Sequence, residues 1–254
     1  MLSFIQSSNL KNGIDFLLVT EHEQTIQLKN KKWNNYKFGI FLLGENITLT
    51  LGCNRKYEEE ELGHLKIKTS HLWIKHSSSK IDCSELGYSM NQGPGKGNSE
   101  GFGGGGYGTK GEGNDGQGGE IYGEETLLKQ IHFGSGGTFG VGGSGGGIIQ
   151  LIIEQQLLND GSIQSNGGNG TCGGGGSGGS ILIELQCQSQ FKQNFGTIKC
   201  IGGNGGYKGG DGRIAIYGIE LSSKRIFLKC NQSTFSVDFN TNYFFYHKKN
   251  HICS

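Results

Sequence analysis

Proline and arginine are almost missing from this chain of 254 residues. The single proline, Pro94, excludes a collagen triple helix, which combines a strict three-residue glycine period with abundant proline. Only three arginines occur, at positions 55, 213 and 225. None lies among the central glycines, which excludes a glycine-rich RNA-binding tail, because arginine supplies its charge and stacks on bases. The net charge of +1 predicts no field that would attract nucleic acid or an anionic membrane.

The cysteine pattern and the apolar runs exclude further classes. Seven cysteines contain no CxxC pair, and their odd number leaves at least one thiol unpaired within the chain. No apolar run approaches the roughly 18–20 residues that span a bilayer, so the sequence predicts no transmembrane segment. Residues 1–20 lack the hydrophobic region of a signal peptide. Either the protein is not secreted by that route or this chain is a fragment of a longer one, and we favour a fragment.

Three glycosylation sequons favour secretion slightly, because short sequons arise by chance in asparagine-rich chains. They make Asn46, Asn169 and Asn231 candidate glycosylation sites.

Glycine is the residue that this chain has in excess, with 42 of its 49 glycines between positions 93 and 212. Together with a hydrophobic content of only 33%, this argues against a compact helical core, since glycine penalises helices. Two segments about 35 residues apart align almost residue for residue: 146–153 matches 178–185, and the third copy of the strand starts at Gly212. A period of this size is typical of repeat architectures.

The aligned copies predict which side chains share a face, because successive strand residues alternate sides. Three inward rows follow: Ile149, Ile181 and Ile214; Leu151, Ile183 and Ile216; and Ile81, Ile163 and Ile198. A small inward position holds Cys83, Ser165 and Cys200. The outward position with Ile148, Ser180 and Arg213 is expected to tolerate any polarity.

These rows predict an all-β chain folded as a right-handed parallel β-helix, a solenoid with long glycine-rich loop insertions. Stacked coils would bury a ladder of aliphatic side chains that no single coil can bury alone. The expected division is an N-terminal strand region or cap at 1–61, the repeat region at 62–217, and C-terminal strands with a tail at 218–254.

The ordered glycine motifs carry a resemblance to known proteins. They are Gly93–Gly95, Gly103–Gly108, Tyr122-Gly123-Glu124, Gly134–Gly137, Asn166–Gly170 and Asp211–Tyr217. Over about residues 62–217 the chain resembles large glycine-rich surface or secreted proteins with β-helix coils of the filamentous-haemagglutinin type. Asp211 departs from the glycine of the last motif. The resemblance implies a cell-surface or extracellular scaffold and transfers no catalytic residue.

Other motifs have ordinary interpretations. The stretch 103–110 approaches a phosphate-binding loop but has Thr109 where the lysine belongs, so we predict no cofactor. His64 and His71 differ in parity on a strand and should face opposite ways; with His76 they are expected to be surface residues, not a metal site. Cys83 and Cys200 should be buried thiols two rungs apart, too distant for a disulfide.

A polysaccharide-acting enzyme would need paired acids on adjacent coils. The acids on the repeat strands are Asp82, Glu154, Glu184 and Asp211, with Arg213 nearby. Glu154 and Glu184 fall at outward positions one residue out of register, as solvated residues do. The favoured hypothesis is a non-enzymatic structural or adhesive module of a cell-surface or secreted protein, with surface proteins or polysaccharide as partners. The alternatives are a glycine-rich ligand-binding receptor segment and, third, a polysaccharide-acting enzyme.

Overall fold

The structure, a computed structural model, describes residues 17–30, 34–36, 39–53, 61–98, 102–138, 140–186 and 193–219, and the short strands 225–230 and 234–235. Its elements are fourteen strands and one short 3-10 helix, all listed by their bounds in chain order. They are β1 (Leu17–Val19), β2 (Thr25–Lys29), β3 (Asn34–Tyr36), β4 (Ile40–Leu42), β5 (Thr48–Gly52), β6 (His64–Ile74), β7 (Lys80–Asp82), η1 (Asn114–Gly116), β8 (Ile148–Asn159), β9 (Ser162–Gln164), β10 (Ser180–Leu185), β11 (Thr197–Lys199), β12 (Arg213–Ile219), β13 (Arg225–Cys230) and β14 (Thr234–Phe235).

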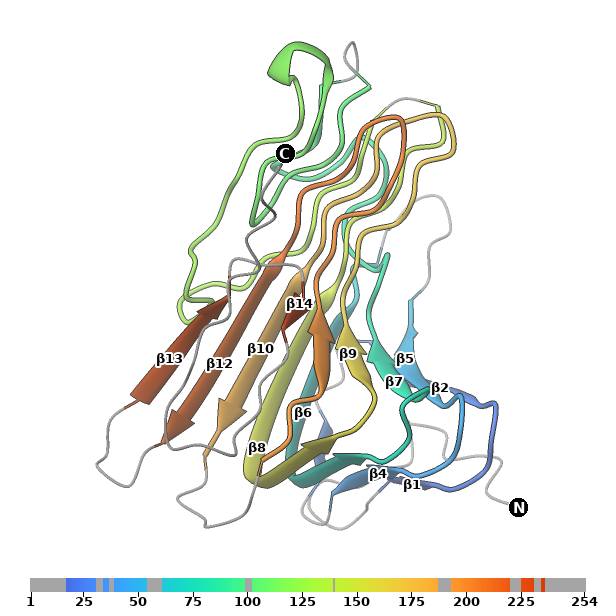
Figure 1. Ribbon diagram of the computed structural model, residues 1–254, viewed down its shortest axis with the longest axis vertical. Helices are drawn as coiled ribbons and strands as arrows, with labels where there is room; N and C mark the ends of the chain where they lie inside the picture. Colours follow the sequence, from blue (N-terminus) through green and yellow to red (C-terminus); the bar gives the residue numbers. More distant parts are fainter. Residues whose placement is uncertain are drawn as a thin grey trace, which may run out of the picture.

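The strands form two sheets (Figure 1). The larger has eight strands in the order β1-β4-β6-β8-β10-β12-β13, with β3 pairing beside β4 on β6. The smaller has six strands in the order β14-β11-β9-β7-β5-β2. Every pair is parallel except β12 with β13 and β11 with β14, so the parallel stacking ends at an antiparallel strand in each sheet.

The inward rows predicted from the repeat are confirmed by the strand register. Ile181 lies opposite Ile149 on one side and Ile214 on the other, and Ile183 lies opposite Leu151 and Ile216. In the smaller sheet, Ile163 lies between Ile81 and Ile198. These side chains are buried in one apolar core between the sheets. Each such side chain contributes on the order of 1.5–3 kcal/mol through its burial, which explains why the alternating aliphatic pattern forms strands here.

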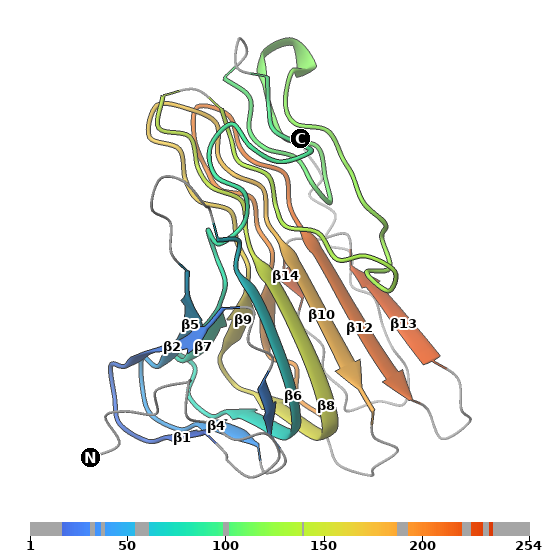
Figure 2. The same ribbon diagram turned by 180° about the vertical axis from the view of Figure 1, so that it is seen from behind.

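The prediction of a right-handed β-helix solenoid is wrong. The coils do not close: the chain forms two separate parallel sheets, and their glycine-rich connections leave both sheets at one end as long excursions (Figures 1 and 2). The physical reason lies in those connections, which span residues 83–147, 165–179 and 200–212. They bond to one another through the backbone and form no further β-strand among the described residues that would close each turn.

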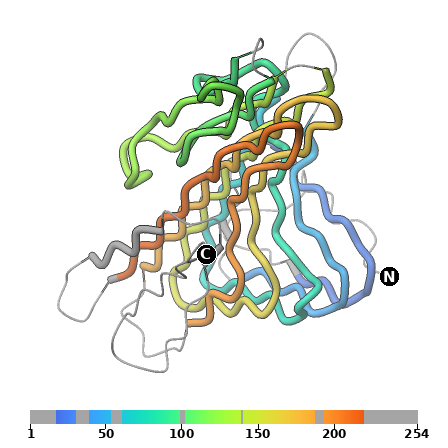
Figure 3. The backbone as a smooth tube through the Cα atoms, turned by 45° about the horizontal axis from the view of Figure 1, so that its top comes forward, coloured from blue at the N-terminus to red at the C-terminus, as the bar shows by residue number. Residues whose placement is uncertain are grey.

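The glycine-rich excursions form a layer of their own, which we call the glycine layer: the described parts of residues 87–147, 166–179 and 201–212. Its segments run side by side in the tube view (Figure 3). The segment 173–178 exchanges backbone hydrogen bonds with five others: residues 105, 135–138, 143–146, 168 and 203–210. Backbone groups of buried segments need partners, and here neighbouring glycine segments provide them, as expected from the absence of obstructing side chains.

Close approach explains why these positions are glycine. A methyl group on Gly176 would lie less than 3.0 Å from the carbonyl of Ser144, and one on Gly118 less than 3.0 Å from the carbonyl of Gly111. Both neighbours are backbone atoms, which cannot turn aside as a flexible side chain does. Any side chain at these sites would therefore push the segments apart.

The outward row of the larger sheet differs from expectation. Ile148, Ser180 and Arg213 are all buried, although polarity was expected to vary freely there. The loop of residues 121–133 covers this part of the sheet: Leu127 and Ile131 pack on Leu182, Ala215 and Tyr217. A row that faces a covering loop is a second interior, so its polar members need specific partners.

Candidate functional site: a polar groove on the glycine layer

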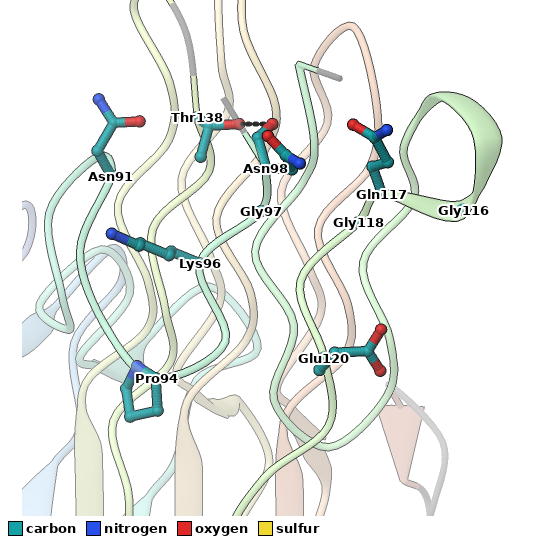
Figure 4. A pocket seen from close by; sticks show the side chains of 10 residues that line it. All are labelled: Asn91, Pro94, Lys96, Gly97, Asn98, Gly116, Gln117, Gly118, Glu120 and Thr138. Carbon is teal, nitrogen blue, oxygen red and sulfur yellow. Dashed lines mark hydrogen bonds between the residues drawn. The ribbon is translucent and has the colours of Figure 1, made fainter. Parts of the chain in front are cut away.

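A groove of about 560 Å³ lies on the glycine layer, between the segments 91–98 and 116–120 (Figure 4). It is lined by Asn91, Pro94, Lys96, Gly97, Asn98, Gly116, Gln117, Gly118, Glu120 and Thr138. The two walls are joined by a backbone hydrogen bond of 3.0 Å from Asn98 N to Gln117 O. The groove is thus a built feature of the layer, with walls fixed by the same backbone bonding.

The side chains of the groove are polar and nearly balanced in charge. Lys96 is exposed, and its amino group points away from the Glu120 carboxylate in Figure 4. Glu120 Oε1 is paired outside the groove with Lys110 Nζ at 2.6 Å. The Thr138 hydroxyl donates to Asn98 O at 3.0 Å. None of the described residues that line the groove is aromatic, so they offer no stacking platform for a base.

Backbone groups of both walls are unused. The N–H groups of Gly97, Gly118 and Glu120 donate no hydrogen bond to any described atom, and the carbonyls of Lys96, Gly97 and Gly118 accept none there. Gly97 and Gly118 are themselves buried. Buried backbone N–H groups without a partner are rare in folded proteins. The groove is therefore able to bond a ligand through the main chain.

Hydrogen bonds through Tyr122 and Ser135 hold the segment that carries one wall of the groove. The Tyr122 hydroxyl donates a hydrogen bond to the carbonyl of Phe133 and accepts one of 2.9 Å from Ser135 Oγ. Ser135 Oγ in turn accepts a hydrogen bond of 3.0 Å from Gly95 N. Burial raises the pKa of Tyr122 above its ordinary value, so the hydroxyl keeps its proton. These hydrogen bonds connect the segment Pro94-Gly95-Lys96 to the loop of residues 121–133.

Arg213 lies in this second interior and is only 7% exposed. Its Nη2 donates to Tyr122 O at 2.9 Å, and its guanidinium lies 5.2 Å from the centre of the Tyr107 ring, a cation–π contact. The Tyr107 hydroxyl bonds Ser180 Oγ at 2.7 Å, and burial raises its pKa to about 12. Desolvation and the Arg213 charge lower the pKa of the adjacent His132. This cluster holds a buried cation beside neutral partners, and Arg213 Nε and Nη1 have no hydrogen-bond partner among the described residues.

The acids considered for catalysis do not converge. Asp82 accepts hydrogen bonds from Lys80 at 2.8 Å, Gln164 at 2.7 Å and Ser84 N at 2.9 Å. Burial alone would raise the pKa of Asp82, but these hydrogen bonds together hold it below its ordinary value. Glu154 is paired with Lys68 at 3.3 Å. These two carboxylates act as ordinary partners of strand residues.

The remaining two acids lie apart as well. Glu184 lies opposite Ile152, which places it two residues from the level of Glu154 and not one as expected. Asp211 accepts a hydrogen bond of 3.0 Å from Gly202 N and thus closes a glycine turn. Arg213 faces the tyrosine cluster and not these carboxylates.

The prediction that His64 and His71 face opposite sides of their strand is wrong. The register of β6 shifts between Thr69 and His71, and this bulge places His64 and His71 on the same outward face. They are seven residues apart, about 23 Å along a strand. His64 packs edge-on against Phe133, and burial lowers its pKa to about 4. His76 is paired with Glu45 at 3.4 Å. No group of three potential metal ligands occurs among the described residues.

Cys83 and Cys200 were predicted to be buried, and they are. Cys83 is a buried free thiol, which confirms that it forms no disulfide with Cys200, also buried. Ser165 lies on the rung between them, as predicted, and its hydroxyl donates to Gly147 O at 2.8 Å. Burial raises the pKa of the Cys83 thiol well above its ordinary value. These residues fill the small inward position.

Two of the three candidate glycosylation sites are described, and both are exposed. Asn46 has a positive φ of 53° and donates its backbone N–H to Ser78 Oγ at 2.7 Å. Asn169 accepts a hydrogen bond of 2.8 Å from Asn204 N through its side-chain oxygen. Asn231 lies outside the described residues. Glycosylation of all three stays a prediction.

Sequence reasoning missed the groove and the tyrosine–arginine cluster. Tyr107 and Tyr122 stood out in the sequence only as parts of glycine motifs, and Arg213 also as an outward strand residue near the candidate acids. Their common location depends on how the long insert folds back. One signal was available: Arg213 stands where its aligned neighbours are Ile148 and Ser180, an unusual charge in an otherwise uncharged row.

Comparisons with protein-family models, curated proteins and solved structures found no match for this chain. Among the described residues, no helix has the length and apolar character needed to cross a membrane.

Proposed function

We propose that this chain is a non-enzymatic structural or adhesive module of a cell-surface or secreted protein. The observation that carries the proposal is the glycine layer, in which segments far apart in sequence are bonded through their backbones. Such bonding holds a long excursion rigid without a hydrophobic core of its own. A rigid platform built in this way suits presentation of a surface.

Two further observations support a scaffold. The aliphatic rows form one continuous core through both sheets, which favours a stiff body. Asp82, Glu154 and Asp211 each hold a neighbouring structural group. An enzyme of the polysaccharide-acting type would keep two acids free on adjacent strands.

The groove favours a second candidate, a ligand-binding segment of a receptor. The two candidates differ in what they require. A receptor segment would bind a soluble protein ligand in a saturable way, while a structural module would be found in a surface layer or filament.

The experiment that tests the leading proposal is localisation in intact cells of the source organism. A tag after Ser254 would be scored by surface labelling and by endoglycosidase sensitivity, with Asn169→Gln as the matched control for a glycan. The expected result is surface labelling with a mobility shift that endoglycosidase removes and that N169Q reduces by one glycan. A protein reached by label only after cells are opened would overturn the proposal.

A further inference from the structure

We propose that the groove binds an extended glycine-rich polypeptide segment of a partner, through main-chain hydrogen bonds. The inference rests on the proposed adhesive role and names the class of partner for it. It starts from the unused backbone groups on the two walls.

The walls present donors and acceptors together. Gly97 and Gly118 each have an N–H and a carbonyl that bond no described atom, and both residues line the groove. An extended peptide carries the same groups in alternation, one donor and one acceptor per residue. A small anion only accepts, so it would leave the carbonyls of the walls unbonded, whereas the hydroxyls of a neutral sugar both donate and accept and make an oligosaccharide the rival ligand.

The glycine layer itself shows how such a segment is held. Gly176 N donates a hydrogen bond of 2.9 Å to Gly168 O, and Gly176 O accepts one of 2.8 Å from Gly203 N, so one residue bonds two neighbouring segments. The groove walls belong to the same layer, since Gly106 N donates to Gly95 O at 2.7 Å and Gly119 N donates to Gly104 O at 2.8 Å. A further segment placed in the groove would extend this pattern by one row.

The fit also sets the composition of the partner. Inside the layer a methyl group would approach a neighbouring carbonyl to less than 3.0 Å at Gly176. A segment bonded on two sides in the groove would meet the same restriction, and alanine at alternate positions should be excluded.

Charge and ring content argue against other ligands. The lining has one cation, Lys96, and one acid, Glu120, which is already paired with Lys110. A strongly charged ligand therefore gains little there. The described lining residues also include no aromatic ring, which is the stacking surface that bases use.

The test uses the full chain and a labelled peptide with the sequence of residues 173–179, Gly-Gly-Gly-Gly-Ser-Gly-Gly. Fluorescence anisotropy would compare it with a peptide carrying alanine at every second glycine. We expect saturable binding of the glycine peptide and at least tenfold weaker binding of the alanine peptide. Gln117→Trp fills the groove and should weaken binding at least tenfold. Val141→Trp, at a site 64% exposed and outside the lining, should not.

A second readout follows the groove directly. The backbone amide resonances of Gly97 and Gly118 should shift on peptide addition, because their N–H groups gain an acceptor. Equal binding of both peptides, an unchanged affinity in Q117W, or saturation of the groove by a neutral oligosaccharide instead of the peptide would overturn the inference. Peptide binding by a protein absent from the surface would contradict the proposed function alone. Surface location without peptide binding would contradict the inference alone.

Discussion

A pair of glycine substitutions in the glycine layer should change stability in opposite directions. Gly176 is enclosed: a methyl group there would meet the Ser144 carbonyl at less than 3.0 Å and Gly143 O at 2.9 Å. Gly206 is exposed, and its nearest neighbour to such a methyl is Gly173 O at 3.7 Å, an ordinary contact. Both residues donate a backbone hydrogen bond of 2.9 Å that alanine keeps. The two sites therefore differ mainly in the free space available to an added methyl group.

The magnitudes follow from that difference. Overpacking a well-packed site costs about 1–3 kcal/mol, and Gly176→Ala belongs at the upper end because the obstructing atoms are backbone. Gly206→Ala should stabilise by about 0.4–1 kcal/mol, because alanine has less conformational freedom in the unfolded chain. The two variants should thus differ by more than about 3 kcal/mol in the free energy of unfolding.

Urea unfolding followed by tryptophan fluorescence would measure the difference. At an m-value of about 2 kcal/mol per molar, a gap of about 3 kcal/mol separates the two midpoints by about 1.5 M. Circular dichroism would check that both variants fold. Equal midpoints for G176A and G206A would refute the reasoning, because they would mean that the layer has room for a side chain.

Three further outcomes are expected. Ile183→Ala, in the buried row between Leu151 and Ile216, should cost about 2–5 kcal/mol by thermal unfolding, and a loss below 0.5 kcal/mol would contradict the core. His64 has a pKa lowered to about 4, so the unfolded state binds its proton first and stability should fall as pH drops from about 6.5 to 4; H64Q should show a flatter pH dependence, and an unchanged curve would contradict burial of the ring. Without denaturant, iodoacetamide should modify the exposed Cys172 and leave Cys83 intact, as mapped by mass spectrometry. Equal labelling of the two thiols would contradict the burial of Cys83.

The repeat predicted the strand register because side-chain alternation has a period of two, and a slip by one residue would turn the aliphatic rows outward. That constraint acts only where apolar residues alternate. It could not decide closure of the coils, because glycine segments carry no side chain whose burial distinguishes a tight corner from a long excursion. The bulge between Thr69 and His71 was also hidden, since it shifts parity inside an uninterrupted strand pattern.

The candidate site was harder still to predict. The groove depends on backbone groups of Gly97 and Gly118, and sequence gives no sign of which glycine N–H groups remain unbonded. The burial of Arg213 depends on the loop 121–133 covering the sheet, a contact between segments about 85 residues apart.

Amide hydrogen exchange of the glycine layer tests the central claim, that backbone bonds between distant segments hold this layer rigid. The amides of Gly174, Gly176 and Gly178 donate to Thr138 O, Gly168 O and Gly210 O at 2.8–2.9 Å. They should exchange as slowly as the strand amides of Ile181 and Ile183, because opening them requires separating several segments at once. Exchange of these three glycine amides at the rate of an unstructured peptide, beside protected strand amides, would contradict the account.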